Sequence, residues 1–161
     1  MQRLLMLMRH AKSAWKSDGP PDHARALNKR GRRDAPRVGK RLAQQGWVPD
    51  HMVGSDSRRT RETWERMQKH FPEARVSFTR ALYGGGPTEL RTEVARLPAG
   101  ERTVLVLGHN PGWEEAVKAL SGRDVRMTTA NVVVLEGKGA TWGEALRRRW
   151  TVVGVVRPKE L

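Results

Sequence analysis

The sequence predicts an α/β fold, a three-layer α/β/α sandwich around a mainly parallel central sheet. Apolar runs of strand length alternate along the chain with stretches of helical spacing. Two of these runs, Leu4–Met8 and Thr103–Leu107, suit strands that are buried on both faces. His10 follows the first run after Arg9, and His109 follows the second after one glycine. Because ligands of such sheets bind outside the carboxyl ends of the strands, we expect both histidines at one edge.

The chain between the first strand and the first helix is predicted to be a surface loop. This polar stretch, Lys12 to Leu27, contains a Gly-Pro-Pro turn and should lie over the His10 edge. Asn28 can then cap a helix that runs to about Gln45, with Gly46 as its stop. Pro36 argues against an unbroken helix here, since proline removes a backbone donor and crowds the preceding turn.

The later elements continue the alternation. Further strands are predicted at residues 50–54, 75–78, 131–136 and 150–156. Further helices are predicted from Ser55 or Ser57 to Pro72, over Leu90–Leu97 and over Trp113–Leu120, and Leu82–Pro87 is predicted as a flexible loop. The last two strands are expected to be antiparallel neighbours, with residues 137–139 as a turn after the first of them. No repeat or linker interrupts the chain, so we expect a single domain over residues 1–161.

Charge is the main signal in the composition. With 31 basic and 17 acidic residues, the formal net charge of +14 implies polyanionic partners such as phosphate esters, phosphoproteins or nucleic acid. The absence of cysteine excludes disulfides, thiolate metal sites and a cysteine nucleophile. No window approaches the roughly 18 apolar residues of a membrane helix, and no signal peptide is recognisable. We therefore expect a cytoplasmic protein with no membrane association.

The candidate catalytic residues are Arg9, His10, Arg59 and His109, which all lie where a strand gives way to a loop or helix. A guanidinium group can donate two parallel hydrogen bonds to the oxygens of one phosphate, and it stays charged. A neutral imidazole can attack phosphorus, and a protonated one can neutralise charge on the equatorial oxygens. Two histidines and two arginines at one point would thus suit phosphoryl transfer. Within the segment 58–61, the choice of Arg59 over its basic neighbours stays open.

These residues resemble the motifs of the histidine phosphatase superfamily. Arg9-His10-Ala11 stands at the family's Arg-His-Gly motif, and Ser55–Thr63 looks like its Ser-x-x-x-Arg-x-x-[Gln/Glu]-Thr segment, with Arg59 at the Arg position. Gly108-His109-Asn110 is similar to its second-histidine motif. The stretches Arg-His-Ala-Lys-Ser-x-Trp and Gly-His-Asn-Pro-Gly look like those of SixA-type phosphohistidine phosphatases. The resemblance extends over nearly the whole chain.

The resemblance implies a phosphoglycerate-mutase-like fold and a phosphatase without metal or cofactor. It implies that His10 is the nucleophile and becomes phosphorylated, and that Arg9, Arg59 and His109 form the phosphate pocket. The implied substrate is phosphohistidine in a signalling protein, and a small phosphorylated metabolite or nucleotide is the rival. Two histidines without a carboxylate cluster do not suit a metal site.

The source of a general acid is where this chain departs from part of the family. The mutase-like branch supplies an acidic residue from a long insertion, which is missing here. A weak acid suits a leaving group that is already good, such as the imidazole of phosphohistidine, and phosphomonoesters of alcohols should then be poor substrates. Glu89, Asp18 and Asp22 stay open as acids, although Asp22 is expected to hold its loop through backbone amides.

Several other residues have two interpretations. Lys12 and Ser13 are substrate contacts or plain surface, and Asn110 binds phosphate or only shapes its turn. Thr128 and Thr129 could present a hydroxyl or amide to the pocket, whereas Trp15 is expected to anchor its loop, with lining of the substrate cleft as the alternative. No part in the chemistry is expected for His23, His51 and His70.

The alternative function is a nucleic-acid-binding module, supported by the basic runs Lys29–Arg33 and Arg147–Arg149. No nucleic-acid motif accompanies these runs, and most of the nine aromatic residues have core spacing. A pseudo-enzyme that binds phosphate without turnover is a third possibility, but the complete set of histidines and arginines argues against it. With no surplus amphipathic helix, we expect a monomer.

Overall fold

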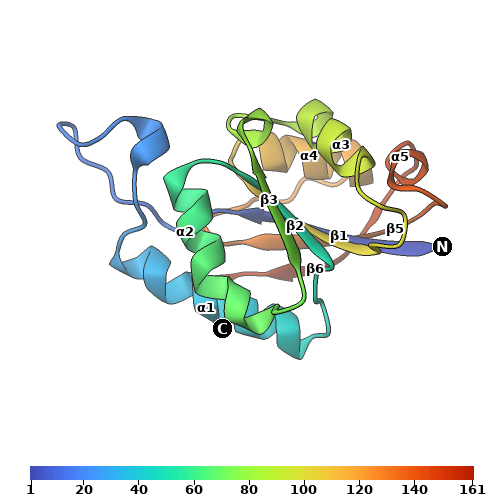
Figure 1. The fold of residues 1–161 in the computed structure, drawn as a ribbon, viewed down its shortest axis with the longest axis horizontal. Helices are drawn as coiled ribbons and strands as arrows, with labels where there is room; N and C mark the ends of the chain where they lie inside the picture. The colour runs from blue at the N-terminus through green and yellow to red at the C-terminus, as the bar shows by residue number, and fades with distance from the viewer.

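A computed structural model describes all residues 1–161. Six strands form one sheet in the order β3-β2-β4-β1-β5-β6. The strands are β1 (Gln2–Arg9), β2 (His51–Ser55), β3 (Arg75–Thr79), β4 (Thr103–Gly108), β5 (Val132–Lys138) and β6 (Thr151–Val156). The helices are α1 (Lys29–Gln44), α2 (Arg58–Met67), α3 (Pro87–Ala95), α4 (Gly112–Ser121) and α5 (Trp142–Ala145). Figure 1 shows α1 and α2 on one side of the sheet and α3, α4 and α5 on the other, which confirms the three-layer prediction.

The sheet is parallel where the candidate site lies. β3, β2, β4 and β1 run parallel, whereas β5 is antiparallel to both β1 and β6. This confirms the mainly parallel sheet and the antiparallel pair of late strands. In the register of β1 with β4, Arg9 pairs with Gly108, so the residues after each strand meet at one edge.

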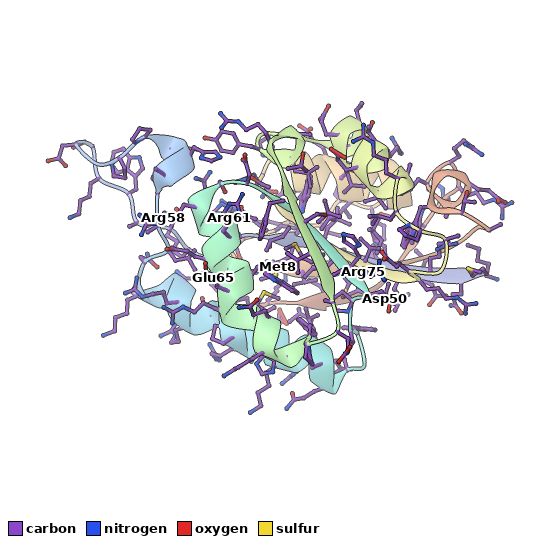
Figure 2. The ribbon with its side chains drawn as sticks, in the orientation of Figure 1. Met8, Asp50, Arg58, Arg61, Glu65 and Arg75 are labelled. Carbon is purple, nitrogen blue, oxygen red and sulfur yellow. The ribbon has the colours of Figure 1, made fainter.

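Burial on both faces explains the unbroken apolar sequence of β1. Leu5 and Leu7 belong to the core layer under α3, α4 and α5, which also contains Trp113. Met6 and Met8 belong to the layer under α1 and α2. The outer face of α2 is polar, and Figure 2 shows Arg58, Arg61 and Glu65 projecting from it while Met8 lies behind in the sheet.

The predicted helix from Asn28 to about Gln45 is confirmed, and two other local predictions were wrong. α1 continues through Pro36, because the apolar face of the helix, with Ala35, Val38 and Leu42, is buried against the sheet and offsets the lost hydrogen bond. α2 ends at Met67 and a 3₁₀ turn follows it, well before Pro72. The stretch 82–87 is not a loop throughout, since residue 82 closes a 3₁₀ turn and residue 87 begins α3.

The structure also contains a helix that was not predicted, α5, which has only four residues and gave no periodic signal. The expected surface loop 12–27 also contains a short 3₁₀ turn, Asp22–Ala24. No helix combines the length and apolar character needed to cross a membrane.

Candidate active site

A cavity of about 460 Å³ opens at the edge where β1, β2 and β4 end. It is lined by the four predicted catalytic residues and by neighbours from three loops. The lining consists of Arg9, His10, Lys12, Ser13, Trp15, Asp22, Arg25, Arg59, Tyr83, Gly84, His109, Asn110 and Thr129. Four of these residues are basic and one is acidic, so the cavity suits an anion.

His10 lies directly after β1 with its ring in a defined tautomer. Its Nδ1 lies 2.7 Å from the carbonyl oxygen of Ala11, and because a carbonyl only accepts, Nδ1 carries the hydrogen. Nε2 therefore keeps its lone pair, which accepts a hydrogen bond from Nε of Arg59 at 3.2 Å. The residue is only 6% exposed. A histidine held in this way presents a nucleophilic nitrogen to the cavity.

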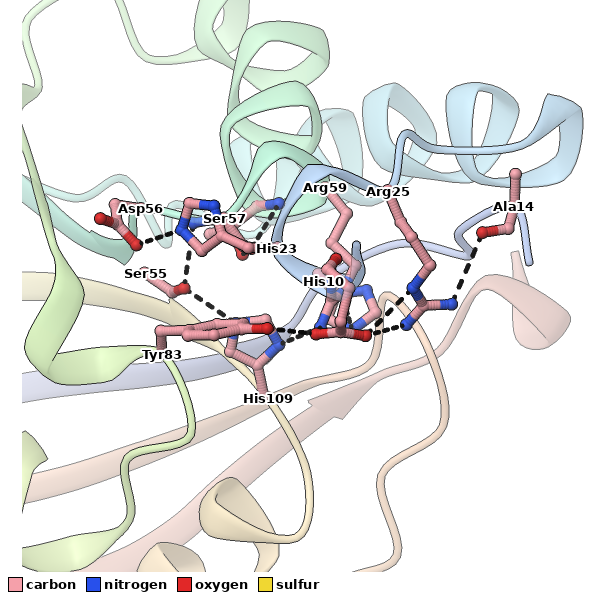
Figure 3. A network of polar contacts seen from close by, with 12 residues as sticks. His10, Ala14, His23, Arg25, Ser55, Asp56, Ser57, Arg59, Tyr83 and His109 are labelled. Carbon is pink, nitrogen blue, oxygen red and sulfur yellow. Dashed lines mark hydrogen bonds and ion pairs between the residues drawn. The ribbon is translucent and has the colours of Figure 1, made fainter. Parts of the chain in front are cut away.

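His109 follows β4, and its ring centroid lies 5.1 Å from that of His10 (Figure 3). Nη2 of Arg59 lies 3.3 Å from Nδ1 of His109, and a guanidinium can only donate, so Nδ1 accepts. Nε2 then carries the hydrogen and donates to Oγ of Ser55, at the end of β2, over 2.8 Å. The Tyr83 ring packs against the same imidazole in a T-shaped arrangement, at a centroid distance of 5.5 Å. His109 is thus oriented by three neighbours.

Arg59 enters the cavity from the first turn of α2. Ser57 caps this helix by accepting from the amide of Thr60, which directs residue 59 inward. Its guanidinium donates to His10, to His109 and to both the carbonyl and carboxylate oxygens of Asp22. The neighbouring basic residues do not reach the cavity, since Arg58 pairs with Glu62 and Arg61 donates to the carbonyl of Asp56.

Arg9 completes the cationic set. Its Nη1 donates to the carbonyl of Met127 over 3.1 Å, and its buried Nε has no hydrogen-bond partner. A buried donor without a partner is costly, so this side chain gains most from an anion that accepts from it.

Both histidines are neutral near pH 7. Burial, reinforced by the neighbouring His109, Arg59 and Arg9, lowers the pKa of His10 to about 3. Burial and then the charge of Arg59 lower the pKa of His109 to about 4. The prediction that one imidazole is neutral agrees with the shift for His10. His109 without a bound anion is therefore neutral too, because it is buried beside cations with too little negative charge to compensate. The predicted role of a protonated imidazole concerns the site with a phosphoryl group bound, and it stays a prediction.

The sequence suggested that Asp22 holds its loop through backbone amides, and this was wrong. Its carboxylate accepts from the hydroxyl of Tyr83, from Nη2 of Arg59 at 3.1 Å and from Nε of Arg25 at 3.1 Å. The hydrogen bond from Tyr83 and the charge of Arg59 lower the pKa of Asp22 to about 2. The carboxylate is thus ionised near pH 7 and cannot donate a proton as a general acid.

The other two candidate acids lie outside the cavity. Oε1 of Glu89 accepts from the amide of Gly86 over 2.7 Å at the start of α3. This contact is one half of the capping box that is common at helix starts, and it explains the position of Glu89 without any catalytic role. Asp18 is not among the lining residues. The cavity therefore contains no carboxylic acid that could protonate a leaving group.

The remaining predicted contacts divide into two groups. Lys12, Ser13 and Thr129 line the cavity. Asn110 also lines it, but its amide hydrogens are used by Glu114 at 2.7 Å and by the carbonyl of Met127 at 2.8 Å. Its amide therefore shapes the turn and has no hydrogen left for phosphate.

Of the two interpretations of Trp15, the structure favours the alternative. The residue is 71% exposed and lines the cavity, so it does not anchor its loop. Thr128 lies outside the cavity, and so do His23, His51 and His70. His23 instead pairs with Asp56 at 2.7 Å.

Three site residues were missed by sequence reasoning: Arg25, Ser55 and Tyr83. Ser55 is the first residue of the Ser-x-x-x-Arg segment and the last residue of a strand, so its position could have identified it as a site residue. Tyr83 is the sole tyrosine, and it follows β3 at the same edge of the sheet. Arg25 offered no signal, because its contact with Asp22 depends on the shape of the loop.

Comparisons with known proteins agree on one family. A model of the histidine phosphatase superfamily (branch 1) matches residues 5–83. The structure is similar to that of a candidate SixA phosphohistidine phosphatase from Nakamurella multipartitia, with 30% identity, a TM-score of 0.87, and coverage of 98% of this chain and 97% of that one. An uncharacterised chloroplastic protein of Arabidopsis thaliana is 36% identical over 98% of this chain and 79% of its own. The fold also matches that of the protein histidine phosphatase SixA complexed with tungstate, at 20% identity and a TM-score of 0.75 over 99% of both chains.

Proposed function

Because the chain belongs to the histidine phosphatase superfamily, in its SixA-type group, we propose that this phosphatase dephosphorylates phosphohistidine through a covalent intermediate on His10. The observation that carries the proposal is the pairing of His10 with Arg59. The lone pair of His10 Nε2 faces a guanidinium that can also hold phosphoryl oxygens, at 3.2 Å.

In the first step, His10 Nε2 attacks phosphorus in line with the bond to the leaving group. The new P–N bond forms while the P–N bond of the substrate breaks, and its electron pair returns to the leaving imidazole. Nε of Arg59 exchanges its hydrogen bond to His10 for one to a phosphoryl oxygen. Arg9 offers its unpaired buried donor to the same group.

His109 is proposed to stabilise the transferring phosphoryl group. A dianion among these side chains raises the pKa of His109, because an opposite charge favours the protonated imidazole. Nδ1 then becomes a donor toward the phosphoryl oxygens, while Nε2 keeps its bond to Ser55. The proton is taken up with the anion and held until the phosphate leaves.

In the second step, a water molecule attacks phosphorus and the P–Nε2 bond breaks. Its electron pair returns to His10, and the water contributes its hydroxyl to inorganic phosphate and its remaining proton to the phosphate oxygens. The hydrogen bond from Nδ1 to Ala11 keeps the same tautomer throughout, so Nε2 is ready for the next cycle.

The substrate class follows from the missing acid. An alkoxide leaving group needs a proton donor. Imidazole instead leaves readily as a neutral ring once the imidazole of the phosphoramidate is protonated. With Glu89 at the start of α3 and Asp22 ionised, the cavity favours a phosphoramidate over the rival class of phosphorylated metabolites.

The test compares turnover of phosphohistidine with that of a simple alkyl phosphate, in the presence of a chelator. We expect release from phosphohistidine at least a hundredfold faster, and loss of this release in His10→Ala. Equal turnover of both substrates by the wild type would overturn the assignment of substrate class.

A further inference from the structure

Helix α1 carries much of the positive charge that the active site does not use. Seven of its residues are basic and one is acidic: Lys29, Arg30, Arg32, Arg33, Arg37, Lys40 and Arg41 against Asp34. None of the seven lines the active-site cavity. Because charged side chains on a helix are often only a solvated face, a further feature is needed to indicate binding.

The buried carboxylate of Asp34 supplies this feature by arranging three arginines. Its side chain is only 2% exposed, and its oxygens lie 3.5 Å from Arg30 Nε, 3.4 Å from Arg33 Nε and 3.5 Å from Arg37 Nη1. Nη2 of Arg37 also donates to the carbonyl oxygen of Leu161 over 3.0 Å. These guanidinium groups therefore hold defined positions, which reduces the entropy lost when they bind an anion.

Beside these arginines the surface is hollowed. A hollow of about 600 Å³ lies between α1 and the 3₁₀ turn Pro158–Glu160, and a second of about 270 Å³ adjoins it at Arg37 and Leu161. Together they form a groove, here called the basic groove. Its cationic lining is Arg30, Arg33, Arg37, Lys40, Arg41 and Lys159.

The basic groove begins near the active site. The amide of Asn28, the residue that caps α1, donates to the carbonyl of Lys12 over 3.0 Å, and Lys12 lines the cavity. Gly31 packs so closely here that an added Cβ would lie 2.1 Å from the same carbonyl oxygen. From this point α1 runs beneath the sheet (Figure 1). Its 16 residues give it a length of about 24 Å. A chain in the groove could thus lead to the cavity.

We propose that the basic groove binds an acidic segment of the phosphorylated protein substrate while its phosphohistidine occupies the cavity. This inference rests on the proposed function and makes the substrate a protein. Arginine forks match carboxylates, and rows of positioned arginines favour glutamate- and aspartate-rich chains. The groove offers no aromatic side chain on which bases could stack, so nucleic acid is the less suitable occupant.

The balance of basic and acidic side chains distinguishes α1 from its neighbour α2. On α2, Arg58 is paired with Glu62 at 3.1 Å, and Arg61 lies over the ring of Phe78 at 4.4 Å. Two carboxylates, those of Glu62 and Glu65 (Figure 2), thus accompany the basic residues of α2. On α1, three arginines share the single carboxylate of Asp34, so the excess of positive charge lies on the α1 side.

The test uses peptides in which a ten-residue flank stands on the N-terminal or the C-terminal side of phosphohistidine. The flank contains either five glutamates or five glutamines. The groove variant is Arg33→Gln, Lys40→Gln and Lys159→Gln combined. Its control, Arg102→Gln, Lys138→Gln and Arg147→Gln combined, removes the same charge from exposed positions near β5 and α5. Phosphoimidazole, which has no flank, reports on the catalytic site alone.

We expect the wild type to have a KM about tenfold lower for the glutamate peptide than for the glutamine peptide, with equal kcat. The groove variant should lose this preference and still hydrolyse phosphoimidazole normally, and the control variant should keep it. Equal losses in both variants, or no preference in the wild type, would overturn the proposal. Displacement of the glutamate peptide by duplex DNA at physiological salt would also overturn the proposal.

The two proposals fail in different ways. If phosphoimidazole and both peptides resist hydrolysis, the proposed function is wrong. The groove is then assayed by binding of fluorescent, unphosphorylated glutamate and glutamine peptides to the same three proteins. Preferential binding of the glutamate peptide that is lost only in the groove variant supports the groove, and its absence overturns it.

Discussion

Nη1 of Arg59 donates to the carbonyl of Asp22 at 2.7 Å, and Nη2 donates to its carboxylate at 3.1 Å. The guanidinium proposed to hold phosphoryl oxygens is thus already bound to an anion of the protein itself. We therefore expect Asp22 and a phosphoryl group to compete for Arg59. The bonds to Asp22 hold Arg59 in position, and the competition should weaken the binding of the product, inorganic phosphate.

Replacing Asp22 by asparagine should strengthen the binding of inorganic phosphate and tungstate about five- to tenfold, because one negative charge leaves a half-exposed site. Inhibition constants at pH 7 measure the effect. Tyr83→Phe is the control, since it removes a hydrogen bond to Asp22 and leaves the charge. Unchanged or weaker anion binding in Asp22→Asn would show that the two anions do not compete.

Acid should destabilise the fold through the two buried histidines. The pKa values of His10 and His109 are about 3 and about 4, below the usual value near 6.5 in an unfolded chain. Between pH 6.5 and 4 the unfolded chain therefore binds more protons, and the free energy of unfolding falls as the pH falls. Each histidine contributes up to about 1.4 kcal/mol per pH unit.

Urea unfolding of wild type and His109→Asn at pH 6, 5.5 and 5 tests this origin. The variant should lose roughly 1 kcal/mol less stability per pH unit over this range. Equal slopes in the two proteins would mean that His109 is not held neutral in the folded chain.

Ser55 is expected to act through His109. It accepts the Nε2 hydrogen of this histidine at 2.8 Å, and Ser55→Ala leaves a buried donor without a partner. We expect kcat to fall up to about tenfold with little change in KM, because the defect concerns orientation in the transition state. Ser13→Ala, at the cavity wall, should have a smaller effect. A dominant rise in KM for Ser55→Ala would contradict this role.

Gly108 is expected to be needed for the packing beneath the site. An added Cβ would lie 2.7 Å from the ring of Trp113, which is fully buried. Gly108→Ala should therefore destabilise the protein by about 1–3 kcal/mol in urea unfolding. Gly100→Ala, where no atom lies within 4 Å, is the control and should be nearly neutral. Similar stability of the two variants would show that Trp113 moves aside freely.

The central part of the site could be predicted because local sequence determines it. Two apolar strands that pair in parallel, residue by residue, must bring the histidines after them to one edge. Arg59 was separable from Arg58 and Arg61 by its place in the motif, and the Ser57 cap of α2 explains why it faces inward.

The rest of the site depends on contacts that local patterns do not encode. Tyr83 reaches Asp22 across 61 residues, through two loops whose shapes depend on the whole fold. Glu89 looked like an acid because it follows the right loop, but a helix start uses its carboxylate. The neutral state of His109 depends on burial, which no motif records.

The most direct test of the account is to trap the phosphoryl group on the enzyme. Wild type and His109→Ala are mixed with labelled phosphohistidine, quenched within milliseconds in alkali, which preserves phosphohistidine, and mapped by mass spectrometry. We predict a phosphoryl group on His10, at a higher level in His109→Ala if hydrolysis slows more than transfer, and none in His10→Ala. Rapid turnover with no label on His10 in either protein would contradict the covalent mechanism.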